Sequence, residues 1–202
     1  RLEQLYQMGV RLITLTWNDD NCFGHPHAKD AGRMQLGLTP FGKEAVTYMT
    51  ERGILVDVSH LSDGGFYDVA ELVKGPFVAS HSNCRELAPA TRNLTDDMIR
   101  ILAEHGGVCG LNFYPPFLNT DPVDKVSRIE RMCEHVKHLV NVGGIECVGI
   151  GTDFDGIEGN LEIADCMEME KLFDALQKKG FCEDDIERIA YKNVERVIRE
   201  VM

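Results

Sequence analysis

Two histidines lie where their side chains could bind one metal ion. His60 ends the apolar run ILVDVSH at 54–60, and His81 ends the run PFVASH at 76–81. If these runs are neighbouring strands, their backbones lie ~4.8 Å apart. Two imidazoles could then meet at one Zn²⁺, with Zn–N distances of about 2.0–2.1 Å. The spacing therefore predicts a shared metal site, although a histidine at a strand end can also be a hydrogen-bonded structural residue.

Asp57 precedes His60 in the same run and has two alternative roles. Its carboxylate could orient an imidazole from behind, as the outer partners of metal ligands do. It could equally accept hydrogen bonds from the backbone. The sequence leaves both roles open.

The stretch VGIGTDFDG, residues 148–156, ends an apolar run with Asp153 and Asp155. A calcium loop of the EF-hand type requires Glu at its twelfth position, where Ala164 stands. A dinucleotide-binding loop requires a different glycine spacing, and carboxylates there would repel a pyrophosphate. Both interpretations are therefore excluded.

Two interpretations of this stretch remain. A strand followed by Asp-x-Asp-Gly resembles the nucleophile motif of haloacid-dehalogenase phosphatases, but Ile157 stands where that motif normally has Thr. The alternative places Asp153 on the same rim as His60 and His81, where a carboxylate can bind a metal-bound water and move its proton. Gly156 suggests a turn at Asp155, so Asp153 is the predicted catalytic residue.

Apolar runs alternate with helical patterns along the whole chain. This alternation predicts an α/β fold with a parallel sheet. Polar residues collect where the runs end, which favours a (β/α)₈ barrel, since such a barrel carries its site at the carboxyl ends of its strands. The expected strands are 11–17, 54–60, 76–81, 106–113 and 146–153; the expected helices follow Thr39, Ser62 and Thr95, cover the stripe from Val126 to Val140, and fill 167–201.

Composition limits the class of protein. The chain has 202 residues, of which 44% are hydrophobic and 27% charged, as in a soluble globular domain. Its net charge of −12 argues against nucleic-acid binding. No apolar run approaches the ~18 residues of a membrane span. Seven scattered cysteines without a C-x-x-C pair favour reduced thiols and a cytoplasmic location.

The motifs, taken in order, resemble the membrane (renal) dipeptidase family and its bacterial members. The resemblance runs from ITLTWN through DVSH, ASHSN and ATRNLTDD to GLNFY, GTDFDG and NVERVI. It implies a metal-dependent (β/α)₈ barrel with two zinc ions, in which a metal-bound hydroxide hydrolyses dipeptides. The expected fold is therefore a TIM barrel of the metal-dependent hydrolase type, represented by its last five βα units.

The resemblance also implies roles for individual residues. His60 and His81 bind one zinc ion, Asp153 handles the catalytic proton, and Arg92 binds the free carboxylate of the substrate. An Arg in a loop after a metal-binding strand can make such a bidentate contact. Three further residues are expected to contact the substrate: Trp17, Asn18 and Tyr114.

Two departures from the family pattern affect these expectations. Trp17 stands where some members have a substrate-contacting His, so Asn18 is the alternative polar contact. The His-x-Asp metal motif and the Glu that bridges the two zinc ions are not found in the chain, so these remaining zinc ligands are expected upstream of Arg1. His25 and His27 resemble a metal motif but are interpreted as solvated or as part of a lid over the substrate.

The chain is therefore expected to be the C-terminal portion of one barrel domain, 1–202, and to be inactive by itself. Five strands of eight leave open sheet edges at 11–17 and 146–153, which a missing segment or a partner chain, such as a second copy in a homodimer, would cover. The alternative functions are a non-catalytic dipeptidase-like binding barrel and a phosphatase that uses Asp153. The sequence does not identify the dipeptide.

Overall fold

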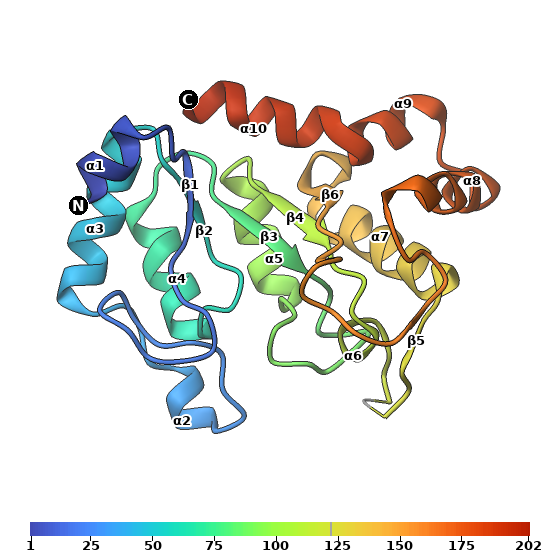
Figure 1. The fold of residues 1–202 in the computed structure, drawn as a ribbon, viewed down its shortest axis with the longest axis horizontal. Helices are drawn as coiled ribbons and strands as arrows, with labels where there is room; N and C mark the ends of the chain where they lie inside the picture. Colours follow the sequence, from blue (N-terminus) through green and yellow to red (C-terminus); the bar gives the residue numbers. More distant parts are fainter. Residues whose placement is uncertain (122) are drawn as a thin grey trace.

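The computed structural model describes residues 1–121 and 123–202, and its centre is a parallel sheet of five strands. The strands lie side by side in the order in which they occur along the chain (Figure 1). This consecutive parallel order confirms the predicted α/β class. The strands are β1 (Leu12–Thr14), β2 (Leu55–Asp57), β3 (Val78–Ser82), β4 (Val108–Leu111) and β6 (Val148–Ile150).

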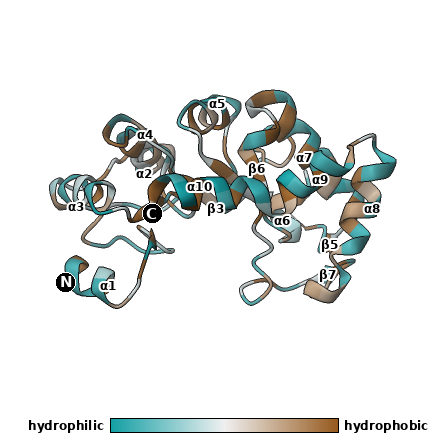
Figure 2. Cartoon of the chain, turned by 90° about the horizontal axis from the view of Figure 1, so that it is seen from above, coloured by the Kyte–Doolittle hydropathy of each residue, from teal (hydrophilic) through white to brown (hydrophobic). Residues whose placement is uncertain are grey.

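Helices connect the strands and cover one face of the sheet. Figure 2 shows α3, α4, α5 and α7 in an arc on one side, each with both hydrophobic and hydrophilic residues. The helices are α1 (Leu2–Gln7), α2 (Ala31–Met34), α3 (Pro40–Glu51), α4 (Asp63–Leu72), α5 (Asp96–Glu104), α6 (Pro115–Leu118), α7 (Ile129–Gly143), α8 (Glu170–Lys178), α9 (Glu183–Glu187) and α10 (Asn193–Val201). Short 3₁₀ turns at Ile145–Cys147 and Cys166–Glu168 and a π turn at Arg188–Lys192 complete the helical segments.

Three of the helices begin at the caps that the sequence predicts. The hydroxyls of Thr39, Ser62 and Thr95 each accept a hydrogen bond from a backbone N–H in the first turn, at 3.0, 3.1 and 3.2 Å. Such bonds satisfy one of the four N–H groups that a helix leaves free at its start. The predicted stripe from Val126 is partly wrong, because α7 begins only at Ile129. Val126 lies instead in β5 (Val126–Ser127), which pairs with β7 (Asn160–Leu161) in a small second sheet.

The two ends of the main sheet differ in chemistry. The first residues of β2, β3 and β4 are Leu55, Val78 and Val108, and they pack with Val197 of α10 in a small apolar cluster. In Figure 1, α10 crosses the molecule at this end of the strands. Side chains two positions apart on a strand share a face. Two positions further along β2 and β3, the residues on the same face are Asp57 and Ser80. The face that carries Leu55 and Val78 therefore becomes polar toward the carboxyl ends of these strands.

The strands are shorter than the sequence predicts. The expected strands ended at His60 and at Asp153, but β2 ends at Asp57 and β6 at Ile150. Both residues lie three positions past the strand and have left-handed backbone conformations, with φ of 69° for His60 and 62° for Asp153. These conformations turn the chain after each strand has ended. His and Asp are among the residues that adopt them more readily than most.

The main sheet is open within the described residues. There, β1 pairs only with β2, and β6 pairs only with β4. The predicted open edges are therefore present at both strands. In residues 1–121 and 123–202 we also find no helix that is long and apolar enough to cross a membrane.

Candidate active site

A pocket of about 740 Å³ lies beyond the carboxyl ends of the strands. Its size is within the usual range of small-molecule sites. A second cavity of about 480 Å³ shares Trp17, His60 and Asp153 with this pocket and adds His81. All the residues expected to form a site therefore line one of these two spaces. The main pocket is lined by Trp17, Asn18, His27, Lys29, His60, Pro89, Ala90, Thr91, Arg92, Tyr114, Pro116, Phe117, Asn119, Thr120, Asp153, Gly156 and Ile157.

The His60 and His81 side chains face each other. Their Nε2 atoms are 2.9 Å apart, and their ring centroids are 4.9 Å apart. Each Nδ1 atom has an oxygen neighbour: Asn18 Oδ1 at 3.2 Å from His60, and Ser80 Oγ at 2.7 Å from His81. The sequence predicted that the two residues could meet if their strands were neighbours, and β2 does pair with β3. The structure brings their ring nitrogens well within the reach of one ion.

Burial keeps these imidazoles neutral. It lowers the pKa of His60 to about 3, with smaller contributions from the charges of Arg92, His81 and His27. The pKa of His81 is also lowered, first by burial and then by Arg92. A neutral imidazole has one nitrogen lone pair free to bind a metal.

The donor set fits a zinc ion in part. The Nε2 atoms of His60 and His81 would hold the ion, because imidazole nitrogen is a usual zinc ligand. Within residues 1–121 and 123–202, however, no three His, Cys, Asp or Glu side chains converge on one point. Catalytic zinc usually has three protein ligands. His60 and His81 therefore supply only part of a metal site.

Asp153 and Asp155 point to different surroundings. Asp153 lines both cavities, and its Oδ2 atom accepts a hydrogen bond of 3.1 Å from Asn112 Nδ2. Asp155 is exposed. Gly156 lies against the Asp153 carboxylate, since a Cβ atom at Gly156 would be 2.5 Å from Asp153 Oδ1. The Asp153 carboxylate thus has a fixed position at the pocket wall, whereas Asp155 faces solvent.

Arg92 is a buried cation, with 5% of its surface exposed. Its Nη2 atom donates to the His81 carbonyl at 3.2 Å, and its guanidinium lies over the Phe117 ring at 5.4 Å from the centroid. Among the described residues, its Nε atom has no hydrogen-bond partner. Burial lowers the pKa of Arg92 to about 10, so it stays charged at neutral pH. In residues 1–121 and 123–202 no carboxylate forms an ion pair with this guanidinium, so its charge is available to an anion that enters the pocket.

The remaining expected residues lie around the pocket. Trp17 is 69% exposed and lines both cavities from their outer side. Asn18 contacts His60 through its side chain. Tyr114 lines the main pocket, and its ring packs edge-on against Phe117 at 5.0 Å.

His27 lines the main pocket, although the sequence analysis interpreted it first as a solvated residue. Its solvated interpretation is wrong, because it is half-buried and lines the pocket. Its backbone N–H donates to the His60 carbonyl at 2.8 Å, and its Nδ1 lies 2.9 Å from Thr91 Oγ1. Burial and the charge of Arg92 lower its pKa to about 4. The alternative interpretation, as part of a covering loop, agrees with this position.

Three buried asparagines connect the strands that bear the site. Asn83 Nδ2 donates to the carbonyls of Asn112 and Phe117, and its Oδ1 accepts from the Asn112 backbone. Asn93 Nδ2 donates to the Phe117 carbonyl as well. Buried amides are stable only when they are hydrogen-bonded in this way. Because Asn112 also binds Asp153, the network sets that carboxylate relative to His81 and Arg92. No motif in the sequence predicts these pairings.

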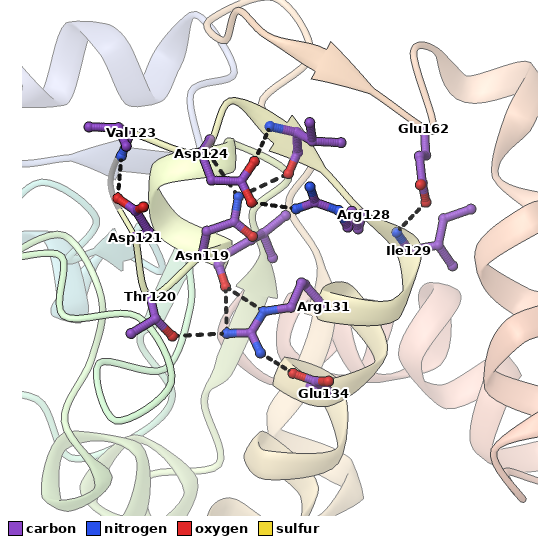
Figure 3. Close-up of polar contacts among 12 residues, drawn as sticks. Asn119, Thr120, Asp121, Val123, Asp124, Arg128, Ile129, Arg131, Glu134 and Glu162 are labelled. Atoms are coloured by element: carbon purple, nitrogen blue, oxygen red, sulfur yellow. Dashed lines mark hydrogen bonds and ion pairs between the residues drawn. The ribbon is translucent and has the colours of Figure 1, made fainter.

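A second network fixes the outer wall of the pocket (Figure 3). Asn119 and Thr120, which line the pocket, lie between α6 and β5. Asn119 Nδ2 donates to the carbonyls of Asp124 and Val126 at 3.1 and 2.9 Å. Arg131 of α7 donates to Thr120 Oγ1 and to Glu134. The loop is therefore held from both sides.

Comparisons with known proteins agree on one family. A family model described as membrane dipeptidase, peptidase family M19, matches residues 1–202. An uncharacterized dipeptidase of Schizosaccharomyces pombe is 35% identical over 199 residues, which are 97% of this chain and 48% of that protein.

Solved structures give the same result. The crystal structure of dipeptidase AC, described as a metallopeptidase of family M19, matches with a TM-score of 0.93 at 32% identity, over 99% of this chain and 60% of that one. A metallopeptidase from Rhodobacter sphaeroides, liganded with a phosphinate mimic of the dipeptide L-Ala-D-Ala, matches with a TM-score of 0.93 at 32% identity, over 100% and 58%. The chain thus spans about half to three fifths of these relatives. Its five βα units are part of a barrel of the metal-dependent hydrolase type, as expected.

Proposed function

The chain belongs to the membrane dipeptidase family, peptidase family M19, and from this premise we propose that the intact protein is a zinc-dependent dipeptidase. One observation carries the proposal. The facing Nε2 atoms of His60 and His81, 2.9 Å apart, adjoin the same pocket as the buried Arg92 cation. A partial metal site next to an anion receptor suits a substrate with a scissile amide and a free carboxylate.

Arg92 orients the substrate in this proposal. Its charged guanidinium binds the α-carboxylate of the C-terminal residue, and the Phe117 ring below it limits its movement. A charge-assisted bond in a buried setting is stronger than one in water. The scissile carbonyl then lies between Arg92 and the histidine pair. The apolar rings of Trp17 and Tyr114 remain for the substrate side chains.

His60 and His81 would hold one of two zinc ions, and residues outside this pair would supply the remaining ligands. Zinc, when bound, acts as a Lewis acid that lowers the pKa of water and stabilises negative charge on a carbonyl oxygen. Asp153 accepts the proton of the attacking water. It then delivers this proton to the leaving amine as the C–N bond breaks, so water is added across the peptide bond. Asn112 keeps the Asp153 carboxylate in place for both transfers.

We also propose a reducing compartment, the cytoplasm, for this protein. All seven cysteines are unpaired in the part of the chain that the structure describes, and four of them are buried. Cytoplasmic proteins keep such thiols reduced.

The test is dipeptide hydrolysis by the intact protein, with zinc measured in the same sample. We expect turnover of dipeptides that zinc chelation removes and zinc addition restores. We expect His60→Ala and His81→Ala each to lower both bound zinc and turnover. Zinc-independent turnover, or magnesium-dependent release of phosphate from phosphate esters, would contradict the proposal.

Trp17 favours one alternative, a binding protein without turnover. The side chain stands at the pocket where some family members have a polar contact, and it is 69% exposed. Saturable dipeptide binding by the zinc-loaded protein without hydrolysis would support this alternative. Gain of turnover in Trp17→His would then identify Trp17 as the cause.

A further inference from the structure

A buried carboxylate lies behind the histidine pair. Asp57 is fully buried at the end of β2. Its Oδ1 atom accepts from the backbone N–H groups of Ser59 and Ser80, at 3.0 and 2.9 Å. Its Oδ2 atom accepts from the hydroxyls of Thr14 and Ser80, both at 2.6 Å. Four donors, from β1, β3 and the turn after β2, therefore surround a group that, as a carboxylate, can only accept.

The Ser80 hydroxyl lies between Asp57 and His81 and contacts both side chains. The Ser80 hydroxyl has one proton and two lone pairs. Its proton goes to Asp57 Oδ2, because that oxygen cannot donate in return. Toward His81 Nδ1, at 2.7 Å, Ser80 Oγ can then act only as an acceptor. His81 must therefore carry its proton on Nδ1.

The remaining contact of Ser80 agrees with this assignment. Ser59 Oγ, 3.4 Å from Ser80 Oγ, accepts from the backbone N–H of His81 at 3.0 Å. Its own proton is thus free to point at the second lone pair of Ser80 Oγ. The Ser80 hydroxyl then donates once and accepts twice, which uses its full capacity.

The backbone at Ser80 has little freedom to change this geometry. Its carbonyl oxygen lies against Gly110 and Gly151, where an added Cβ atom would come within 2.0 Å at either position. Its N–H is bound to Asp57. The position of Ser80 Oγ, and with it the choice of proton on His81, is therefore set by the sheet.

We propose that Asp57 and Ser80 are positioning residues that fix His81 as the Nδ1–H tautomer. The lone pair of His81 then lies on Nε2, the atom that faces His60 Nε2 at 2.9 Å. Fixing a ligand tautomer through an outer hydrogen bond is a known way to raise metal affinity. The tautomer itself is independent of the reaction, whereas its effect on zinc rests on the proposed function.

Asp57→Asn provides the sharpest test, because it changes one atom and reverses the direction of the chain of hydrogen bonds. The two backbone donors hold the amide oxygen at the Oδ1 position. The amide NH₂ then occupies the Oδ2 position and donates to Ser80 Oγ. Ser80 in turn donates to His81 Nδ1, which moves the His81 proton to Nε2, into the space between the two rings.

The measurement is long-range ¹H–¹⁵N correlation NMR on the metal-free intact protein at neutral pH, with His81 assigned by its loss in His81→Gln. We expect Nδ1–H in the natural protein and Nε2–H in Asp57→Asn. Ser80→Ala should give a mixture of both tautomers, and Ser80→Thr should restore Nδ1–H. Titration with Zn²⁺ alone should show affinities 10–100-fold weaker for Asp57→Asn and Ser80→Ala.

Thr14→Val is the matched control. It removes the other 2.6 Å hydroxyl bond to the same Asp57 oxygen but has no contact with His81. If Asp57 only joins the strands, Thr14→Val and Ser80→Ala should affect the tautomer and zinc affinity equally. That result would overturn the proposal, as would an Nε2–H tautomer in the natural protein or an unchanged tautomer in both Asp57→Asn and Ser80→Ala. If the tautomers respond as expected but the zinc-loaded protein hydrolyses no dipeptide, only the proposed function fails.

Discussion

At the scale of single residues, the two aspartates after β6 offer the most direct test of the proposed mechanism. Asp153 lines the pocket with its carboxylate bound to Asn112, while Asp155 is exposed. We predict that Asp153→Asn lowers kcat for dipeptides by about 10²–10⁴-fold, because the amide cannot carry the proton. Zinc content should be unchanged, because the proposed zinc ligands are His60 and His81 and not Asp153. Steady-state kinetics and metal analysis check both parts.

Asp155→Asn is the control for this change. It removes the same charge two positions away, at the surface. We expect its kcat to stay within about twofold of the natural protein. A larger loss in Asp155→Asn than in Asp153→Asn would reverse the assignment of the catalytic carboxylate.

Arg92 is expected to distinguish substrates by their C-terminal charge. A lost charge-assisted bond costs about 1.5–3 kcal/mol, so Arg92→Ala should raise KM for dipeptides roughly 10–100-fold. Dipeptide amides lack the charge, and their KM should change much less. Parallel kinetics on the two substrate types measure the difference. Equal changes for both would remove Arg92 from the substrate site.

His135 makes stability depend on pH. The side chain is fully buried; its Nδ1 accepts from the Cys84 N–H and its Nε2 donates to the Leu118 carbonyl. Burial lowers its pKa to about 4, opposed by the Leu118 bond and aided by Arg131 and His138. In the unfolded chain the pKa is about 6.5. As pH falls below about 6.5, only the unfolded state gains the proton, so the free energy of unfolding decreases until pH reaches about 4.

We predict that this histidine contributes a loss on the order of 3 kcal/mol between pH 7 and 4. His27 and His60 have lowered pKa values and act in the same direction. His135→Gln keeps a donor and an acceptor and should make the pH dependence shallower in urea unfolding. His25→Gln, at a partly exposed position, is the control. An unchanged slope in His135→Gln would contradict the prediction.

At the scale of elements, close backbone contacts hold the site strands together. A Cβ atom at Gly151 would lie 2.0 Å from the Ser80 carbonyl oxygen, whereas one at Gly75 would have no neighbour within 4 Å. We predict that Gly151→Ala lowers the free energy of unfolding by about 1–3 kcal/mol, through overpacking. Zinc affinity should fall as well, because Ser80 must move and His81 follows it. Gly75→Ala should change neither quantity. Denaturant unfolding and zinc titration test the pair.

The sequence predicted the elements better than it predicted their ends. The Thr39, Ser62 and Thr95 caps were recognisable because a hydroxyl before a helical pattern is a local signal. The conformations of His60 and Asp153 were not, since a positive φ at a residue other than Gly has no such signal. The predicted strands were therefore too long, although His60 and Asp153 still line the cavities beyond the strand ends.

The same limit applies to the site. Strand-end histidines and the Asp pair were visible because the carboxyl ends of parallel strands converge. The asparagine network and the pocket position of His27 depend on contacts between residues far apart in the chain, which a single sequence does not encode locally. The sequence left two roles open for Asp57, orienting an imidazole or accepting backbone hydrogen bonds, because its neighbours are also far away in the chain. The structure shows that its carboxylate accepts backbone hydrogen bonds and also bonds Ser80, a neighbour that only the paired strands bring to it.

At the scale of the whole molecule, the open sheet predicts association. β1 has one neighbour strand among the described residues, and Leu12 on it is 41% exposed. We expect residues 1–202, produced as such, to self-associate, because an unpaired edge offers N–H and C=O groups to another chain. Leu12→Lys should shift the chain toward the monomer in sedimentation velocity experiments. Leu36→Lys, at a 40% exposed position outside the sheet, is the control. A monomer at all concentrations would contradict this expectation.

The two left-handed residues at the pocket have a consequence for how such a protein changes over many generations. His60 and Asp153 each hold a backbone conformation that disfavours side chains by about 1–2 kcal/mol and that Gly adopts freely. While the reaction is under selection, replacement by Gly is eliminated. Once selection relaxes, the same replacement stabilises the fold and accumulates. A lineage that has kept the fold but given up hydrolysis should therefore show Gly or Asn at these two positions before its core changes. The residues found at positions 60 and 153 of related proteins would then indicate which lineages lost hydrolysis early.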